Sequence, residues 1–185
     1  MGVRGARYLP LLALAVAVSG CALVREVDPD PAAIPDGPLE ALGADATGPV
    51  IELGSGRTFG VGWRYSIYES DDGWCTQLET TSVTSSGCGP IAPIDSAFGG
   101  IGFSGDSPDG PAPIEGMLSA EVAEVWIEVS TGERIETRIM SLADAGLDGS
   151  AFVGFAPENI PVRSVTALDV DGNVLETWEA PTVGR

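Results

Sequence analysis

The stretch Val61-Gly62-Trp63-Arg64-Tyr65-Ser66-Ile67 decides the fold class, because large apolar residues alternate in it with small or polar ones. Successive side chains of a β-strand point to opposite faces, so this period of two predicts a strand with one buried face. The stretch Val125-Trp126-Ile127-Glu128-Val129 repeats the pattern further along the chain. The sequence therefore predicts an all-β domain.

Short turn sequences separate the alternating stretches, as in Asp71-Asp72-Gly73 and Asp171-Gly172-Asn173. Asp-Gly tolerates the positive φ values of tight turns and indicates antiparallel hairpins. Hairpins at this spacing predict a small antiparallel β-sandwich of about seven to eight strands, with a small barrel as the alternative. The expected strands are 50–53, 58–68, 74–80, 121–129, 134–140, 151–155, 164–169 and 174–178.

The chain divides into three expected parts. Residues 1–20 begin with Arg4 and Arg7, continue with an apolar run and end in small residues, which is the order of a secretory signal peptide. Residues 21–48 are rich in Asp, Pro, Ala and Gly and predict a disordered acidic tether. Residues 49–185 form the β-sandwich domain, in which the Gly- and Pro-rich segment 89–116 is expected to be a long loop and the first place to look for a ligand site.

The end of the signal segment, Val18-Ser19-Gly20-Cys21, resembles the lipobox of bacterial lipoproteins. The resemblance implies cleavage before Cys21 and lipid attachment to its thiol. Two acyl chains hold a protein firmly to a bilayer, so the expected location is the outer, extracytoplasmic face of the cell membrane. An ordinary signal peptide followed by a chance cysteine is the alternative.

The charge balance excludes several functions. The chain has nine basic and 27 acidic residues, and without Arg4 and Arg7 of the signal segment seven basic residues remain, a net charge of −20. Such a chain repels nucleic acid and anionic lipid headgroups. Histidine is absent from the sequence, which excludes Ser-His-Asp and Cys-His catalysis and imidazole metal ligands. No cofactor is expected.

Two cysteines remain once Cys21 is assigned to lipid. In an oxidising compartment Cys75 and Cys88 are expected to pair in a disulfide. A catalytic thiol pair or a metal site is the alternative. The Trp74-Cys75 strand and the later Gly87-Cys88-Gly89 turn, followed by paired strands, resemble uncharacterised extracytoplasmic domains of actinobacterial lipoproteins. This resemblance covers about the last two thirds of the chain and implies no activity.

The strongest catalytic candidate is Asp95. Its surroundings, Ile94-Asp95-Ser96-Ala97, resemble the signature of aspartic proteases, and Phe152-Val153-Gly154 resembles their downstream element. In such enzymes two carboxylates share one proton and activate water. This chain has one copy of the motif, so a homodimer would have to supply the second Asp. A chance match in an acidic, glycine-rich segment is the alternative.

Two weaker candidates concern metal and ligand binding. Asp169, Asp171 and Asn173 offer oxygen donors at alternate positions, as calcium loops do, although a hairpin turn explains the same residues. Trp126 is a candidate for stacking on a carbohydrate, because the alternation that buries Val125 places it on the opposite face.

The remaining tryptophans, Trp63, Trp74 and Trp178, complete a candidate platform or pack inside the fold. Glu121, Glu124 and Glu128 are expected to form a solvated charged face.

These observations predict a membrane-tethered, non-enzymatic interaction or ligand-binding domain. Its expected partners are the lipid bilayer, through acylated Cys21, and an envelope or cell-wall component. The alternatives are a carboxylate-based hydrolase that uses Asp95 and a structural component of the envelope.

Overall fold

The computed structural model describes residues 45–71, 73–81, 84–89, 94–103 and 110–181. The expected signal segment 1–20, the lipid site Cys21 and most of the expected tether lie outside the described residues. No helix in the described part of the chain is long and apolar enough to cross a membrane.

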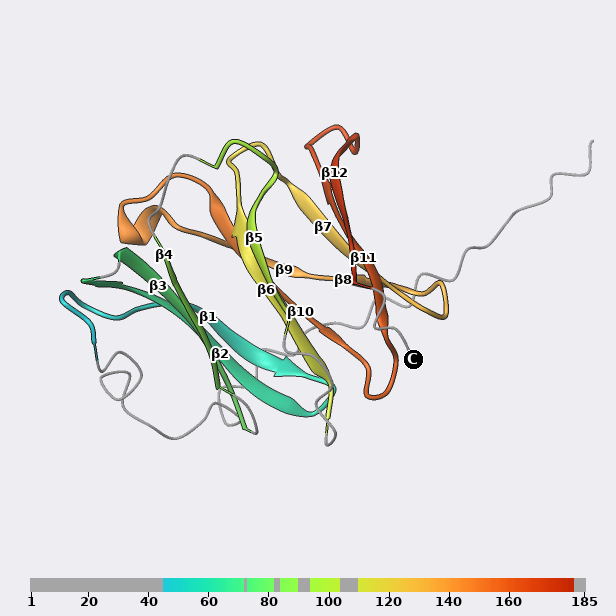
Figure 1. The fold of residues 1–185 in the computed structure, drawn as a ribbon, viewed down its shortest axis with the longest axis horizontal. Coiled ribbons are helices and arrows are strands. Elements are labelled where there is room, and N and C mark those ends of the chain that lie inside the picture. Colours follow the sequence, from blue (N-terminus) through green and yellow to red (C-terminus); the bar gives the residue numbers. More distant parts are fainter. Residues whose placement is uncertain (1–44, 72, 82–83, 90–93, 104–109, 182–185) are drawn as a thin grey trace, which may run out of the picture.

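The described chain contains twelve antiparallel strands and one short 3-10 helix, η3 (Figure 1). The strands form three sheets of four, in the orders β1-β2-β3-β4 (sheet A), β5-β6-β10-β9 (sheet B) and β12-β11-β7-β8 (sheet C). Their bounds are β1 Ile51–Thr58, β2 Val61–Ser70, β3 Gly73–Thr80, β4 Thr84–Gly89, β5 Phe98–Phe103, β6 Ala112–Leu118, β7 Glu124–Val129, β8 Arg134–Glu136, β9 Arg138–Ser141, β10 Ser150–Ala156, β11 Val162–Leu168 and β12 Val174–Glu179, with η3 at Ala143–Ala145.

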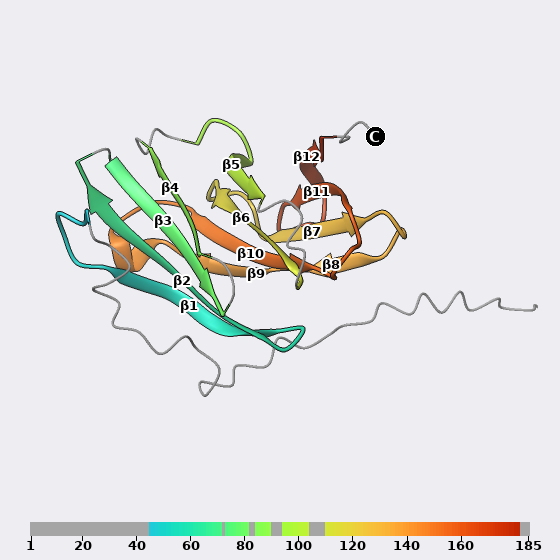
Figure 2. The same cartoon turned by 60° about the horizontal axis from the view of Figure 1, so that its bottom comes forward.

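Sheet B lies between the other two and packs against both of them (Figures 1 and 2). On β10, Ala151, Val153 and Phe155 belong to a core cluster with Trp63 of sheet A. The next residue in the alternation, Phe152, belongs to a second cluster with residues of sheet C. Both faces of β10 are therefore buried, which explains why this strand has an almost continuous apolar sequence.

The predicted all-β, antiparallel sandwich class is confirmed. The number of strands is larger than the seven to eight expected, because β4, β5 and β6 have sequences without a strong β pattern and one expected strand is divided in two. One of them, β4, reads Thr-Ser-Ser-Gly-Cys-Gly, and glycine and serine have no strong preference for strands. Pairing with β3 along its whole length makes this segment a strand.

The single strand expected at 134–140 is two strands in different sheets. β8 pairs with β7 in sheet C, whereas β9 pairs with β10 in sheet B. Thr137 lies between them, and its hydroxyl donates a hydrogen bond to the Val125 carbonyl at 3.0 Å. The chain crosses from sheet C to sheet B at Thr137. The alternating residues of 134–140 therefore do not lie on one face of a single sheet.

The segment 89–116 is not one long loop, which corrects the expectation from its composition. It contains β5 and most of β6, and these two strands pair in sheet B. Glycine is required in β6 because a Cβ at Gly116 would collide with the Gly100 carbonyl oxygen and lie 2.7 Å from the Phe152 ring. Gly116 is therefore a position of close packing between strands and not part of a loop.

Candidate ligand-binding cavity

A cavity of about 380 Å³ lies between sheets A and B. Its lining comes from β2, β3 and β4 on one side and from β5 and β6 on the other. Strands β4 and β5 are edge strands of their sheets, and Figure 2 shows both of them on the same side of the molecule. The volume is within the range of small-molecule pockets, at its lower end.

The cavity exists because the edge strands carry glycine where side chains would fill the space. On β4, Gly87 pairs with Thr76, and a Cβ at Gly87 would have no atom within 4 Å. On β5, Gly100 has the same open space, and Gly102 lies directly over the Glu115 side chain. The segment expected to be a loop thus provides one wall of the cavity.

Two buried polar side chains, Glu115 of β6 and Tyr65 of β2, line the cavity from opposite sheets. Glu115 is 7% exposed and Tyr65 is fully buried. Glu115 Oε1 accepts a hydrogen bond of 2.8 Å from the Ser85 hydroxyl of β4, which connects the two sheets. Glu115 Oε2 and Tyr65 Oη have no hydrogen-bond partner of good geometry in the described part of the chain.

Burial dominates the electrostatics of this pair. It raises the pKa of the Glu115 carboxyl above its ordinary value, while the hydroxyls of Ser85 and Tyr65 oppose the rise by stabilising the carboxylate. Burial and the nearby Glu115 charge raise the pKa of the Tyr65 hydroxyl strongly, so Tyr65 stays protonated. Among the described residues that line the cavity, these two are the titratable groups, since Cys88 is in a disulfide.

The remaining lining is mostly apolar or small. Ile67 and Trp74 contribute from sheet A, and Met117 contributes from sheet B. The cavity therefore combines an apolar wall with a polar floor, which suits a small ligand with one apolar and one polar end.

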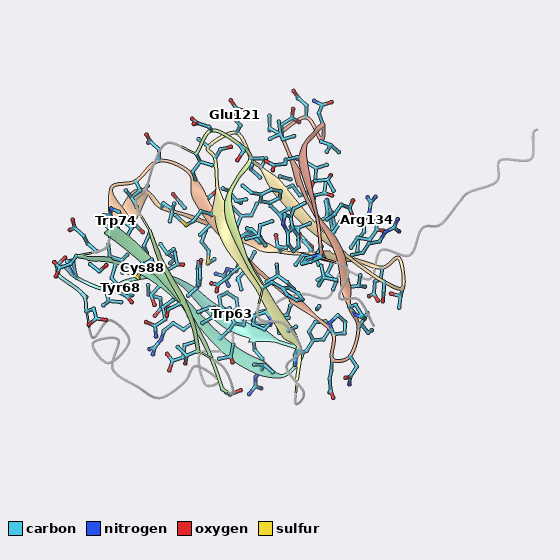
Figure 3. The ribbon with its side chains drawn as sticks, in the orientation of Figure 1. Trp63, Tyr68, Trp74, Cys88, Glu121 and Arg134 are labelled. Atoms are coloured by element: carbon cyan, nitrogen blue, oxygen red, sulfur yellow. A yellow bond between two sulfur atoms is a disulfide. The ribbon has the colours of Figure 1, made fainter. Side chains whose placement is uncertain are left out.

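The expected disulfide between Cys75 and Cys88 is confirmed. The two cysteines are direct cross-strand partners on β3 and β4, with a sequence separation of 13 residues. Cys88 is also part of the cavity lining, and Figure 3 shows it near Trp74 in sheet A. The disulfide holds the edge strand that forms one wall of the cavity.

Asp95 does not line this cavity, although its neighbour Ile94 does. Asp95 is exposed on the segment before β5. The neighbouring Ser96 hydroxyl donates a hydrogen bond of 2.7 Å to the Phe98 carbonyl. The Phe152-Val153-Gly154 stretch lies in the central strand β10, where Phe152 is fully buried.

Asp169, Asp171 and Asn173 lie in the turn between β11 and β12. Asp169 Oδ1 accepts hydrogen bonds from the backbone N–H groups of Asp171 and Asn173, and Oδ2 accepts one from the Asn173 side chain. These bonds lower the pKa of Asp169, the Asn173 side chain contributing most. The described residues contain no group of three or more acidic or cysteine side chains arranged to hold a metal ion.

The four tryptophans do not share a face. Trp63 is buried between sheets A and B, Trp178 packs against the core between sheets B and C, and Trp74 lines the cavity. Trp126 is half-buried on β7, where its partners are Thr166 and Glu136.

The expected acidic face is only partly solvated. Glu121 is exposed, whereas Glu124 and Glu128 are half-buried. Glu128 forms an ion pair of 2.8 Å with Arg163 and a longer one of 3.9 Å with Arg134, so β7, β8 and β11 share this group. Figure 3 shows Glu121 and Arg134 at separate places on the molecule.

Comparison with known proteins adds no assignment, since no protein family, curated sequence or solved structure matches the chain. Tyr65 and Glu115 were not singled out as individual candidates from the sequence, although Glu115 lies in the segment 89–116 that was expected to be the first place to look for a ligand site, and Trp74 belonged to the candidate platform. One signal pointed to Glu115, which is the only charged residue in the otherwise apolar stretch of β6, Ala-Pro-Ile-Glu-Gly-Met-Leu. An isolated acid in a buried strand often marks a functional group.

Proposed function

We propose that this protein is a lipid-anchored, extracytoplasmic ligand-binding protein, and that the cavity between sheets A and B is its binding site. The observation that carries the proposal is the pair of buried polar groups, Glu115 and Tyr65, which line the cavity and whose Oε2 and Oη atoms form no hydrogen bond of good geometry with each other or with other described residues. Leaving a buried polar group unpaired costs about 1–3 kcal/mol, so a ligand that pairs with these atoms recovers that cost on binding.

Support for a small ligand comes from the shape of the site. The cavity is bounded by two sheets that pack through a common core, so its walls are largely formed before binding. The glycines of β4 and β5 leave room for a ligand beside the polar floor. A preformed site of this kind loses little conformational entropy on binding.

Support for the location comes from the sequence alone. The signal-like residues 1–20 and the lipobox-like residues 18–21 predict a lipid on Cys21, and the acidic segment that follows would separate the domain from the bilayer. A Cys21→Ser variant expressed in a bacterium that lipidates proteins should move from the membrane fraction to the soluble fraction. If this variant stays in the membrane fraction, lipid on Cys21 is not the anchor.

The binding site is tested by filling the cavity. In Gly87→Leu the new side chain would enter the open space, since nothing lies within 4 Å of a Cβ at this position. Thr84→Leu is the matched control, because Thr84 is exposed at the other end of the same strand and is not part of the lining. The measurement is the change in amide NMR shifts of cavity residues on titration with benzyl alcohol, a neutral probe small enough for the cavity.

Wild-type protein and Thr84→Leu should show saturable shifts at the cavity, and Gly87→Leu should show none at the same concentrations. Equal binding by all three proteins would place the probe elsewhere and contradict the proposed site. The same would follow if benzyl alcohol moved no cavity resonance in the wild-type protein.

A further inference from the structure

The charges around the cavity indicate which ligands it accepts, a question that rests on the proposed function above. Glu115 is the one acidic side chain among the described lining residues, and no arginine is among them. The sequence contains no lysine or histidine, so basic side chains are limited to arginine. A negatively charged ligand would lie close to the buried Glu115 carboxyl group. The described lining residues include no basic side chain that could balance the charge of the ligand.

The charge of the whole chain acts in the same direction. With a net charge of −18, the protein attracts cations and repels anions at a distance, more strongly at low ionic strength. Carboxylate and phosphate ligands are therefore disfavoured both on approach and inside the cavity.

The buried carboxyl group itself is poorly compensated. Its Oε1 accepts one hydrogen bond from Ser85, and its Oε2 accepts none of good geometry from the described residues, although the Tyr65 hydroxyl lies near enough to stabilise the charge. A positively charged donor placed at Oε2 would form a charge-assisted hydrogen bond, which is about twice as strong as one between neutral groups. Trp74 and Tyr65 also line the cavity and offer aromatic rings, which attract organic cations.

We propose that the cavity binds a small organic cation, an amine or a related group with a short apolar body, whose charged end pairs with Glu115 Oε2 and whose body packs against Ile67, Trp74 and Met117. The cavity of about 380 Å³ limits the ligand to a small molecule.

Three probes of one shape test this assignment: benzylammonium, benzyl alcohol and benzoate. Their affinities are measured by NMR titration in about 0.15 M salt, where exposed charges more than about 8 Å apart are largely screened. The proteins compared are wild type, Glu115→Gln and Glu133→Gln. Glu133 is exposed in the turn between β7 and β8, so its substitution removes the same formal charge at a distance from the cavity.

Benzylammonium should bind the wild-type protein at least about tenfold more tightly than benzyl alcohol, and benzoate should bind least, as the energy of a charge-assisted hydrogen bond predicts. Glu115→Gln should abolish the preference for benzylammonium while benzyl alcohol still binds. Glu133→Gln should keep the wild-type preference.

Three results would overturn the proposal. Equal or tighter binding of benzyl alcohol or benzoate to the wild-type protein would show that the cavity binds ligands but does not select cations. An equal loss of preference in Glu115→Gln and Glu133→Gln would assign the effect to the general charge of the protein. Absence of binding by all three probes would overturn the binding site together with the cation preference.

Discussion

Replacing the two aromatic residues of β10 tests whether sheet B supports the whole fold. Phe152 is fully buried and its ring lies 6.1 Å from that of Phe98, whereas Phe155 is 1% exposed and lies 6.2 Å from the ring of Trp63. The two side chains point to opposite faces of the strand and belong to different core clusters. Phe152→Ala and Phe155→Ala therefore remove one large side chain from each core.

Each substitution should lower the free energy of unfolding by about 3–5 kcal/mol, the usual cost of replacing a buried Phe with Ala. For a domain of this size that is roughly 10–20 °C in Tm. Urea unfolding followed by fluorescence gives the change in free energy, and thermal unfolding followed by circular dichroism gives the change in Tm. Val170→Ala is the control, because Val170 is 86% exposed and its loss should change stability by less than about 0.5 kcal/mol.

Amide hydrogen exchange shows whether the layers unfold together. If sheet B joins one cooperative unit, both Phe variants should speed exchange in β2 of sheet A and in β11 of sheet C. The reasoning is refuted if Phe152→Ala or Phe155→Ala costs no more than Val170→Ala, since neither side chain would then be part of a packed core.

Three further predictions concern single groups. Replacing both Cys75 and Cys88 with serine should cost about 3 kcal/mol in urea unfolding, the chain-entropy estimate for a loop closed over 13 residues; an unchanged midpoint would contradict a stabilising role for the bond. Burial raises the pKa of Glu115 in the folded state above its ordinary 4.5, so the folded state holds the proton longer, and the free energy of unfolding should fall as pH rises from 4.5 through the raised value. In Glu115→Gln the free energy of unfolding should not show this decrease with pH. Identical pH profiles for wild type and variant would contradict the assignment to Glu115. Millimolar calcium should leave Tm unchanged, because the Asp169 carboxylate already accepts three hydrogen bonds within the turn; a calcium-dependent rise in Tm would show a metal site there.

The sequence predicted the strands whose apolar residues alternate. β2, β3, β7 and β12 each overlap the predicted stretch, because apolar residues alternate with polar or smaller ones along them. In β2 the expectation of a single buried face was wrong, since Arg64 and Ser66 on the other face are buried as well. β11 follows the same rule, with a bulge between Val162 and Ser164.

Strands without that alternation escaped prediction for two physical reasons. β4 and β5 are edge strands rich in glycine, and their sequences reflect the space they leave open. β6 is buried on both faces and contains Pro113 and Gly116, so it shows no period of two. The segment 89–116 was identified as a place to look for a ligand, but the pairing of Tyr65 with Glu115 in one cavity was not predictable, since these two residues are far apart in the sequence and are brought together by the packing of two sheets.

The proposed cation pairing is tested most directly by an NMR titration of the Glu115 carboxyl carbon with and without benzylammonium. In the free protein the pKa should lie above the ordinary 4.5 because the group is buried, and saturating benzylammonium should lower it because the bound cation stabilises the carboxylate. Benzyl alcohol should have no comparable effect. A Glu115 pKa at 4.5 in the free protein, or one that benzylammonium leaves unchanged, would contradict the assignment of Glu115 as the charged floor of a cation-binding cavity.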